Sequence, residues 1–241
     1  MSSRVSLFVT CIVDQLFPKI GLSMATVLER LGYSVDFPER QTCCGQPAFN
    51  NGYWAEARIV ARHFLDTFED CELIVAPSGS CVSMVTNHFA ELFRKEPETL
   101  ARVETLRRRV WEFSAFLTEM AGVEDVGARL EEVVTFHDGC HALRELGIRD
   151  GPRRLLAHVQ GLELREMEPP AECCGFGGTF AVKFDELSRA MAATKADAIV
   201  RTGASAVVSL DPSCLMQIRG ALARAGAPVR AMHLAEVLAS V

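Results

Sequence analysis

Two short stretches, 130 residues apart, decide the fold: residues 43–49, Cys-Cys-Gly-Gln-Pro-Ala-Phe, and residues 173–180, Cys-Cys-Gly-Phe-Gly-Gly-Thr-Phe. Each cysteine pair belongs to a set of four, with one cysteine before the pair and one after it. The first set is Cys11, Cys43, Cys44 and Cys81, and the second is Cys140, Cys173, Cys174 and Cys214. Matched members of the two sets differ by 129, 130, 130 and 133 positions. This nearly constant offset predicts an internal duplication with four thiols in each copy.

Strand-length apolar runs alternate with amphipathic helical patterns around these cysteines. The predicted strands are residues 5–13, 33–37 and 73–76 in the first copy, and 133–136, 162–166 and 206–210 in the second. The predicted helices are residues 18–31, 51–68, 152–159, 185–201 and 215–225, with a further helix over 99–120 bridging the copies. Such alternation predicts an α/β fold of two pseudo-symmetric Rossmann-like halves with parallel sheets. With a boundary near 122–129, the expected domains are residues 1–121 and 122–241.

The placement of the cysteines along these elements predicts a site. Every cysteine of the two sets lies close to the carboxyl end of a predicted strand. Sites in parallel sheets form outside the carboxyl ends of the strands, so the four thiols of each set can converge at one edge. The ninth cysteine, Cys71, precedes the apolar run 73–76 and is interpreted as a buried core residue.

Composition excludes several classes of protein. A hydrophobic content of 49% with 23% charged residues is typical of a folded chain rather than of a disordered or coiled-coil one. The net charge of −6 without a basic patch argues against nucleic acid as a partner. The sequence contains no run of 18 apolar residues, which a transmembrane helix would need, and residues 5–13 are not followed by a signal-peptide cleavage site. We therefore expect a cytoplasmic protein, in which nine thiols favour metal binding over disulfides.

The spacing of the thiols favours an iron–sulfur cluster over zinc. Thiolates select zinc, copper(I) or iron–sulfur clusters. Structural zinc sites usually contain two Cys-x-x-Cys knuckles. In an extended backbone the side chains of an adjacent pair diverge, so the two thiols reach two irons of one cluster more easily than one ion. Zinc at one or both sites remains the alternative. No Ser-His-Asp order or paired carboxylates suggest a catalytic residue.

These motifs resemble those of the cysteine-rich CCG domain family, which includes a cysteine-rich subunit of heterodisulfide reductase, and most closely those of its lactate utilization protein A members. The motifs are residues 43–50, His137-Asp138-Gly139-Cys140-His141, residues 173–178 and Asp211-Pro212-Ser213-Cys214-Leu215-Met216. The resemblance covers essentially the whole chain. It implies an iron–sulfur electron-transfer protein that acts with other iron–sulfur and accessory subunits in the oxidation of L-lactate to pyruvate. A thiol–disulfide redox enzyme and a zinc-binding scaffold of the same complex are the alternatives.

The chain departs from the heterodisulfide reductase pattern at one position in each copy. The cysteine-rich reductase subunit has a fifth cysteine where this chain has Ser78 and Asp211. The departure speaks against the five-thiolate cluster and its disulfide-cleaving chemistry, and leaves a four-thiolate [4Fe–4S] cluster in each set, up to two in all. Asp211 is a candidate oxygen ligand, although a cap or turn role before Pro212 is favoured.

Two histidines flank Cys140 in the second copy alone. His137 and His141 are candidates for an iron ligand or a proton relay, although we favour a supporting role in which one donates a hydrogen bond to a cluster sulfur or a strand-end carbonyl. The four other histidines, at positions 63, 88, 158 and 233, fall in predicted helices or at the surface and receive no role.

Overall fold

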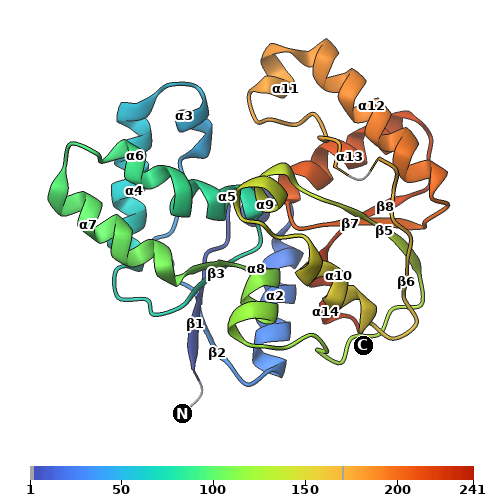
Figure 1. Ribbon diagram of the computed structural model, residues 1–241, viewed down its shortest axis with the longest axis horizontal. Helices are drawn as coiled ribbons and strands as arrows, with labels where there is room; N and C mark the ends of the chain where they lie inside the picture. Colours follow the sequence, from blue (N-terminus) through green and yellow to red (C-terminus); the bar gives the residue numbers. More distant parts are fainter. Residues whose placement is uncertain (1–2, 170) are drawn as a thin grey trace.

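The computed structural model describes residues 3–169 and 171–241 and contains two four-stranded parallel sheets (Figure 1). The first sheet has the order β2-β1-β3-β4, from β1 (Arg4–Leu7), β2 (Ser34–Asp36), β3 (Ile74–Ala76) and β4 (Val110–Glu112). The second has the order β6-β5-β7-β8, from β5 (Val133–His137), β6 (Glu163–Leu164), β7 (Ala206–Ser209) and β8 (Arg230–His233). All strand pairs in both sheets are parallel. The two sheets thus have the same topology, which confirms the predicted α/β fold class.

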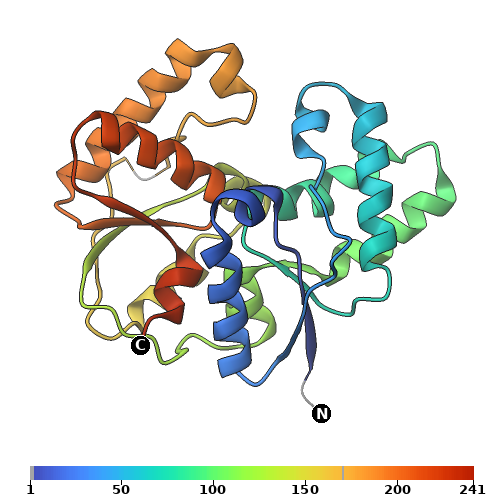
Figure 2. The same ribbon diagram turned by 180° about the vertical axis from the view of Figure 1, so that it is seen from behind.

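Helices connect the strands in a similar order in both halves, and the first half has two further helices, α6 and α7, before its last strand (Figures 1 and 2). The first half contains α1 (Cys11–Leu16), α2 (Pro18–Arg30), α3 (Gln46–Asn50), α4 (Trp54–Phe68), α5 (Gly79–Ser83), α6 (Phe89–Leu92), α7 (Pro97–Leu106) and α8 (Phe113–Ala115). The second contains α9 (Cys140–Glu145), α10 (Asp150–Ala157), α11 (Phe180–Lys183), α12 (Asp185–Arg201), α13 (Pro212–Arg224) and α14 (Leu234–Ala239). Single π-helical turns follow α5, over Met84–His88, and α8, over Phe116–Met120. Within the described ranges, no helix is both long enough and apolar enough to span a bilayer.

The first predicted strand, over residues 5–13, was too long. Strand β1 ends at Leu7, and Cys11 begins helix α1 after Thr10, which has the extended backbone of an N-cap residue. Periodicity could not find this break, because a short apolar run fits a buried strand and a buried helix equally well. The break has a consequence for the site, since it places Cys11 at the start of a helix.

The single bridging helix predicted over residues 99–120 was wrong. Helix α7 ends at Leu106, a 3₁₀ turn covers Arg107–Arg109, and Val110–Glu112 forms β4, which pairs with β3. Val110 and Glu112 are buried, and pairing with β3 satisfies backbone groups that a surface helix would have satisfied internally. Strand β8 and helix α14, the counterparts of β4 and α8 in the second half, were not predicted either.

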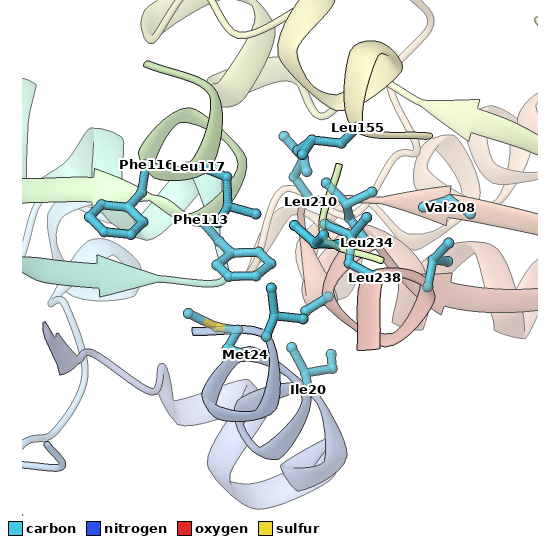
Figure 3. Close-up of a cluster of buried hydrophobic side chains, with 14 of the residues drawn as sticks. Ile20, Met24, Phe113, Phe116, Leu117, Leu155, Val208, Leu210, Leu234 and Leu238 are labelled. Carbon is cyan, nitrogen blue, oxygen red and sulfur yellow. The ribbon is translucent and has the colours of Figure 1, made fainter. Parts of the chain in front are cut away.

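One hydrophobic core joins the two halves (Figure 3). Helix α2 of the first half packs against α14 of the second, and α10 of the second half packs against α8 of the first. The core therefore combines Ile20, Met24, Phe113, Phe116 and Leu117 with Leu155, Val208, Leu210, Leu234 and Leu238. The Arg30 guanidinium adds hydrogen bonds to the carbonyls of Val126, Leu238 and Ala239. These contacts between helices of different halves hold the carboxyl edges of the two sheets in a fixed position relative to each other. The division at residues 121 and 122 stays a prediction.

Candidate metal centre

All eight cysteines of the two sets line a single cavity of about 220 Å³. Cys11 and Cys140 begin α1 and α9, directly after the first strand of each half. The pairs Cys43-Cys44 and Cys173-Cys174 lie in the loops that follow β2 and β6. Cys81 and Cys214 lie in the first turns of α5 and α13, after the third strand of each half. The structure thus brings the predicted thiols together at the carboxyl edges of both sheets, whereas Cys71 lies outside the cavity lining.

The thiols of each set contact one another in the same way in both halves. The Cys11 thiol donates to Sγ of Cys43 at 3.7 Å, and Sγ of Cys43 also accepts from the Gly45 N–H at 3.4 Å. These contacts hold the pKa of Cys43 well below its ordinary value. Hydrogen bonds from Cys140 and Cys174 and from the Gly175 N–H lower the pKa of Cys173 in the same way. Each set therefore favours one thiolate, the form of cysteine that binds metals, at Cys43 and at Cys173. The same hydrogen bonds raise the pKa of the donor thiols of Cys11 and Cys140.

The glycine after each cysteine pair has a backbone conformation that would strain a residue with a Cβ. Gly45 and Gly175 have φ values of +83° and +81°, in the left-handed region that favours glycine. A Cβ on Gly175 would also lie 2.7 Å from the Ser188 carbonyl oxygen. This conformation turns the glycine N–H towards the sulfur of the first cysteine of the pair, and such hydrogen bonds tune metal–thiolate centres.

His137, at the end of β5, lies beside the second set. Its ring is buried, and one ring nitrogen with the sulfurs of Cys174 and Cys214 forms a group of ligand atoms all within 4.8 Å of one another. In the described part of the chain neither ring nitrogen has a hydrogen-bond partner, so the strand-end carbonyl considered as an acceptor is not one. Burial, with a smaller contribution from Lys195, lowers the pKa of His137 to about 3. A neutral imidazole with two unsatisfied nitrogens in a thiol cluster fits a site that receives a further group.

His141 lies on the cavity wall, half-buried, and contacts both halves. Its Nδ1 is 3.6 Å from Sγ of Cys140, and its Nε2 is 3.3 Å from Nε2 of Gln46 in α3. His141 therefore touches one thiol of the second set and also helix α3 of the first half.

Ser78 and Asp211, the two positions without the fifth cysteine, contact each other across the halves. Asp211 directly precedes α13, at the N-cap position, but its side chain makes no cap bond to that helix. Its carboxylate instead accepts hydrogen bonds from Oγ of Ser78 at 2.9 Å, from Oγ of Ser80 at 2.7 Å and from N–H of Ser80 at 3.2 Å. Asp211 thus holds the start of α5, the helix that carries Cys81.

His233 was given no role from the sequence, but it is buried at the junction of the halves. Its Nδ1 accepts from the Ala235 N–H, so the hydrogen lies on Nε2 in the neutral ring. Nε2–H then faces the carbonyls of Pro77 and Leu210, at 3.1 and 3.0 Å, which directly precede Ser78 and Asp211. His88 also has partners, since its ring packs against Phe49 and its Nε2 lies 3.0 Å from Glu145.

Lys195 is a second residue that sequence analysis missed. It is fully buried on α12, and its Nζ donates to Sδ of Met167 at 3.4 Å. Its signal was present in the sequence: it is a lysine in the apolar stripe of the predicted helix 185–201, in register with Ala192 and Ile199.

A duplicated parallel fold with four cysteines at each carboxyl edge defines a protein with two cysteine-rich domains. The cysteine-rich domain family named CCG matches the chain twice, over residues 5–86 and 134–219, which together exceed half of its length. Lactate utilization protein A of Geobacillus kaustophilus is 45% identical over 235 residues, which cover 98% of both chains. Lactate utilization protein A of Bacillus subtilis is 44% identical over 237 residues, covering 98% of this chain and 99% of the relative. The chain therefore belongs to the lactate utilization protein A family of CCG-domain proteins.

A solved structure shares the fold at low sequence identity. A hypothetical protein from Helicobacter pylori superposes with a TM-score of 0.68 at 10% identity over 98% of this chain. This chain spans about half of that protein, 48% of its length. At this identity the similarity concerns the fold alone.

Proposed function

We propose that the protein is an iron–sulfur electron-transfer component of a system that oxidises L-lactate to pyruvate. The observation that carries the proposal is the convergence of two sets of four thiols on one cavity. The link to lactate comes from the names of the relatives, which are 44–45% identical over nearly the whole chain. We propose further iron–sulfur and accessory subunits as partners, and the reducing cytoplasm, where thiols persist, as the compartment.

The donor set of each half fits a four-thiolate cluster. Four cysteine thiolates are the usual ligands of a [4Fe–4S] cluster, so the chain has ligands for two. Cys11, Cys43, Cys44 and Cys81 would hold one cluster, and Cys140, Cys173, Cys174 and Cys214 the other. A bound cluster supplies one-electron transfer. The chain's own residues hold the thiolates in place, and the N–H groups of Gly45 and Gly175 donate to their sulfurs.

Zinc at the second set is the second candidate, because one observation favours it. The group formed by His137, Cys174 and Cys214 combines imidazole and thiolates, as many zinc sites do. A thiol–disulfide redox enzyme is less well supported. Ser78 and Asp211 take the positions of the fifth cysteines and are hydrogen-bonded to each other.

Metal analysis of the protein purified without oxygen tests the proposal. Two four-iron clusters predict about eight iron atoms and about eight sulfides per chain. Cys44→Ser and Cys174→Ser should each remove about half of the iron, whereas Cys71→Ser, the matched control outside both sets, should retain all of it. Two zinc ions without sulfide, or equal iron in Cys44→Ser and the parent, would contradict the proposal.

The lactate assignment has its own test. A strain that lacks the gene should lose growth on L-lactate and keep growth on pyruvate. The parent gene should restore growth, and the Cys44→Ser gene should not. Normal growth of the deletion strain on L-lactate, with no second copy of the gene, would refute the assignment.

A further inference from the structure

A pair of residues behind the cysteine sets differs in chemical character between the two halves. Phe8 lies three residues before Cys11, as His137 lies three residues before Cys140. Helices α4 and α12 also correspond. The buried residues of α4, which are Ala57, Ala61, Phe64, Leu65 and Phe68, recur on α12 with the same spacing as Ser188, Ala192, Lys195, Ala196 and Ile199. The pair Phe8 and Phe64 is thus replaced by His137 and Lys195 in the second half.

The correspondence of the helices also holds in space. A Cβ on Gly45 would lie 3.6 Å from the carbonyl oxygen of Ala57, and one on Gly175 would lie 2.7 Å from that of Ser188. Each helix therefore packs against the loop of its own cysteine pair at the matched position. Residues seven positions further along, Phe64 and Lys195, lie two turns on along the same helical face. Figure 1 shows α4 and α12 in corresponding places in the two halves.

In the first half this pair is apolar and well packed. The rings of Phe8 and Phe64 are buried and meet edge to face, with centroids 4.9 Å apart and planes at 83°. Phe68 completes the cluster, 5.7 Å from Phe8 and 4.6 Å from Phe64. The first cysteine set is backed by an aromatic cluster without charge.

In the second half the pair is polar and incompletely satisfied. Lys195 is fully buried, and the acceptor of its ammonium is the thioether of Met167, which is a weak one. Met167 packs in one buried cluster with Cys174 and Cys214, so Lys195 lies behind the second cysteine set. Burial lowers the pKa of Lys195, and the nearby side chains of Glu172, Cys174, Asp138 and Cys173 act in the opposite direction. Among residues 3–169 and 171–241, Oε2 of Glu172 and both nitrogens of His137 have no hydrogen-bond partner. Burying a cation in this way is costly unless negative charge lies close to it.

A metal–thiolate centre supplies such negative charge. Four thiolates exceed the positive charge of one zinc ion, and four thiolates with four sulfides exceed that of the irons of a cluster. The excess grows by one unit when a cluster accepts an electron. In a low-dielectric interior a fixed cation nearby favours the more negative state strongly.

We propose that Lys195 is the fixed counter-charge of the second cysteine set, which makes that set bind its metal centre more tightly and gives its cluster a higher reduction potential than the cluster of the first set. The statement about potential rests on the proposed iron–sulfur function, and the statement about affinity does not. Electrons that enter the protein would reside mainly on the second centre, because its potential is higher. The difference between the two residue pairs thus gives a symmetric fold a direction of electron flow.

Redox titration of single-cluster proteins tests the potential. Cys44→Ser leaves the second centre and Cys174→Ser leaves the first, so each potential is measured alone by electron paramagnetic resonance. Lys195→Met should shift the potential of the Cys44→Ser protein to a more negative value and leave that of the Cys174→Ser protein unchanged. Lys195→Arg, which keeps the charge, should retain the parent potential. Equal potentials in the two single-cluster proteins, no shift with Lys195→Met, or the same shift in both backgrounds would overturn the proposal.

Two controls separate charge from packing. Phe64→Met alters the matched position of the first half without changing charge, and should leave both potentials unchanged. Lys95→Met removes an exposed lysine, and should do the same. If Lys195→Met does not fold, Lys195→Gln is the second neutral variant, with the same expected shift.

A zinc protein would refute the proposed function but still test Lys195. Metal-free protein titrated with Zn²⁺ against a chromophoric chelator reports the affinities of the two sites. Lys195→Met should weaken one site by about tenfold and leave the other unchanged. Unchanged affinity at both sites would overturn the counter-charge, whatever metal the protein holds.

Discussion

Removing the Asp211 carboxylate should destabilise the protein by loosening the contact between its halves. Asp211 is buried, and its carboxylate accepts three hydrogen bonds from Ser78 and Ser80 of the other half. Asp211→Ala leaves two hydroxyls and one N–H without this acceptor. The hydroxyls of Ser78 and Ser80 can still bond to each other, since their oxygens are 3.1 Å apart, but the partly buried N–H of Ser80 loses its partner.

The magnitude follows from these three bonds. A hydrogen bond to a charged group contributes about 1.5–3 kcal/mol, and the bond between the two hydroxyls recovers part of the loss. The burial cost of the carboxylate also disappears in the variant. We therefore expect Asp211→Ala to lower the free energy of unfolding by about 3 kcal/mol. With a urea m-value of about 3 kcal/mol/M, the midpoint of unfolding falls by about 1 M.

Urea unfolding followed by far-ultraviolet circular dichroism measures the effect at equal metal content. Asp211→Asn should lose about half as much, because its amide oxygen still accepts while its amide nitrogen faces the Ser80 N–H. In a double-mutant cycle Ser80→Ala and Asp211→Ala should be coupled. Asp70→Ala, which removes an exposed carboxylate after α4, is the control. An Asp211→Ala protein within about 0.5 kcal/mol of the parent would refute a role for the carboxylate in joining the halves.

Two further predictions concern the same junction. A Cβ on Gly79 would lie 2.7 Å from Cβ of Ala142. Gly79→Ala should therefore lower the free energy of unfolding by about 1–3 kcal/mol, and a second substitution, Ala142→Gly, should recover part of this loss. A Gly79→Ala protein as stable as the parent would contradict this packing. Burial raises the pKa of Glu112 to about 7, so the folded protein binds a proton more tightly than the unfolded chain and stability falls as pH rises between about 4.5 and 7. Glu112→Gln keeps an acceptor for the N–H groups of α8 and does not titrate. Its free energy of unfolding, measured with urea, should therefore rise relative to that of the parent by about 2 kcal/mol between pH 5.5 and 8. A difference that does not change with pH would contradict the raised pKa.

Local patterns in the sequence were sufficient to predict the duplication and the two parallel sheets. The two cysteine sets revealed the duplication, and the alternation of strands and helices predicted two parallel sheets. The order of the elements then predicted the edge at which the thiols meet. Each of these inferences rests on spacing along the chain, which a duplication preserves.

The missed elements and residues depend on contacts between distant segments. Residues 110–112 continue a helical pattern, and their pairing with β3 is what makes them a strand. His233 forms no local pattern either, because its partners are the carbonyls of Pro77 and Leu210, 156 and 23 residues away. Asp211 precedes a proline and looks like a cap of its own helix. Only the folded chain shows that it serves the other half.

Duplication creates two equal sites, and the residues that break the symmetry are those through which the sites can come to differ. The second half has His137 and Lys195 in place of Phe8 and Phe64, so it lacks their aromatic packing. An edge-to-face aromatic pair contributes about 0.5–1.5 kcal/mol beyond the area that it buries. Stability alone gives no reason for the exchange, since a buried lysine and an unsatisfied histidine add a further cost. Such a loss is expected where a group bound at the site makes use of the polar side chains. The chemistry of the protein should therefore differ between the two cysteine sets, and the difference should begin at these two residues.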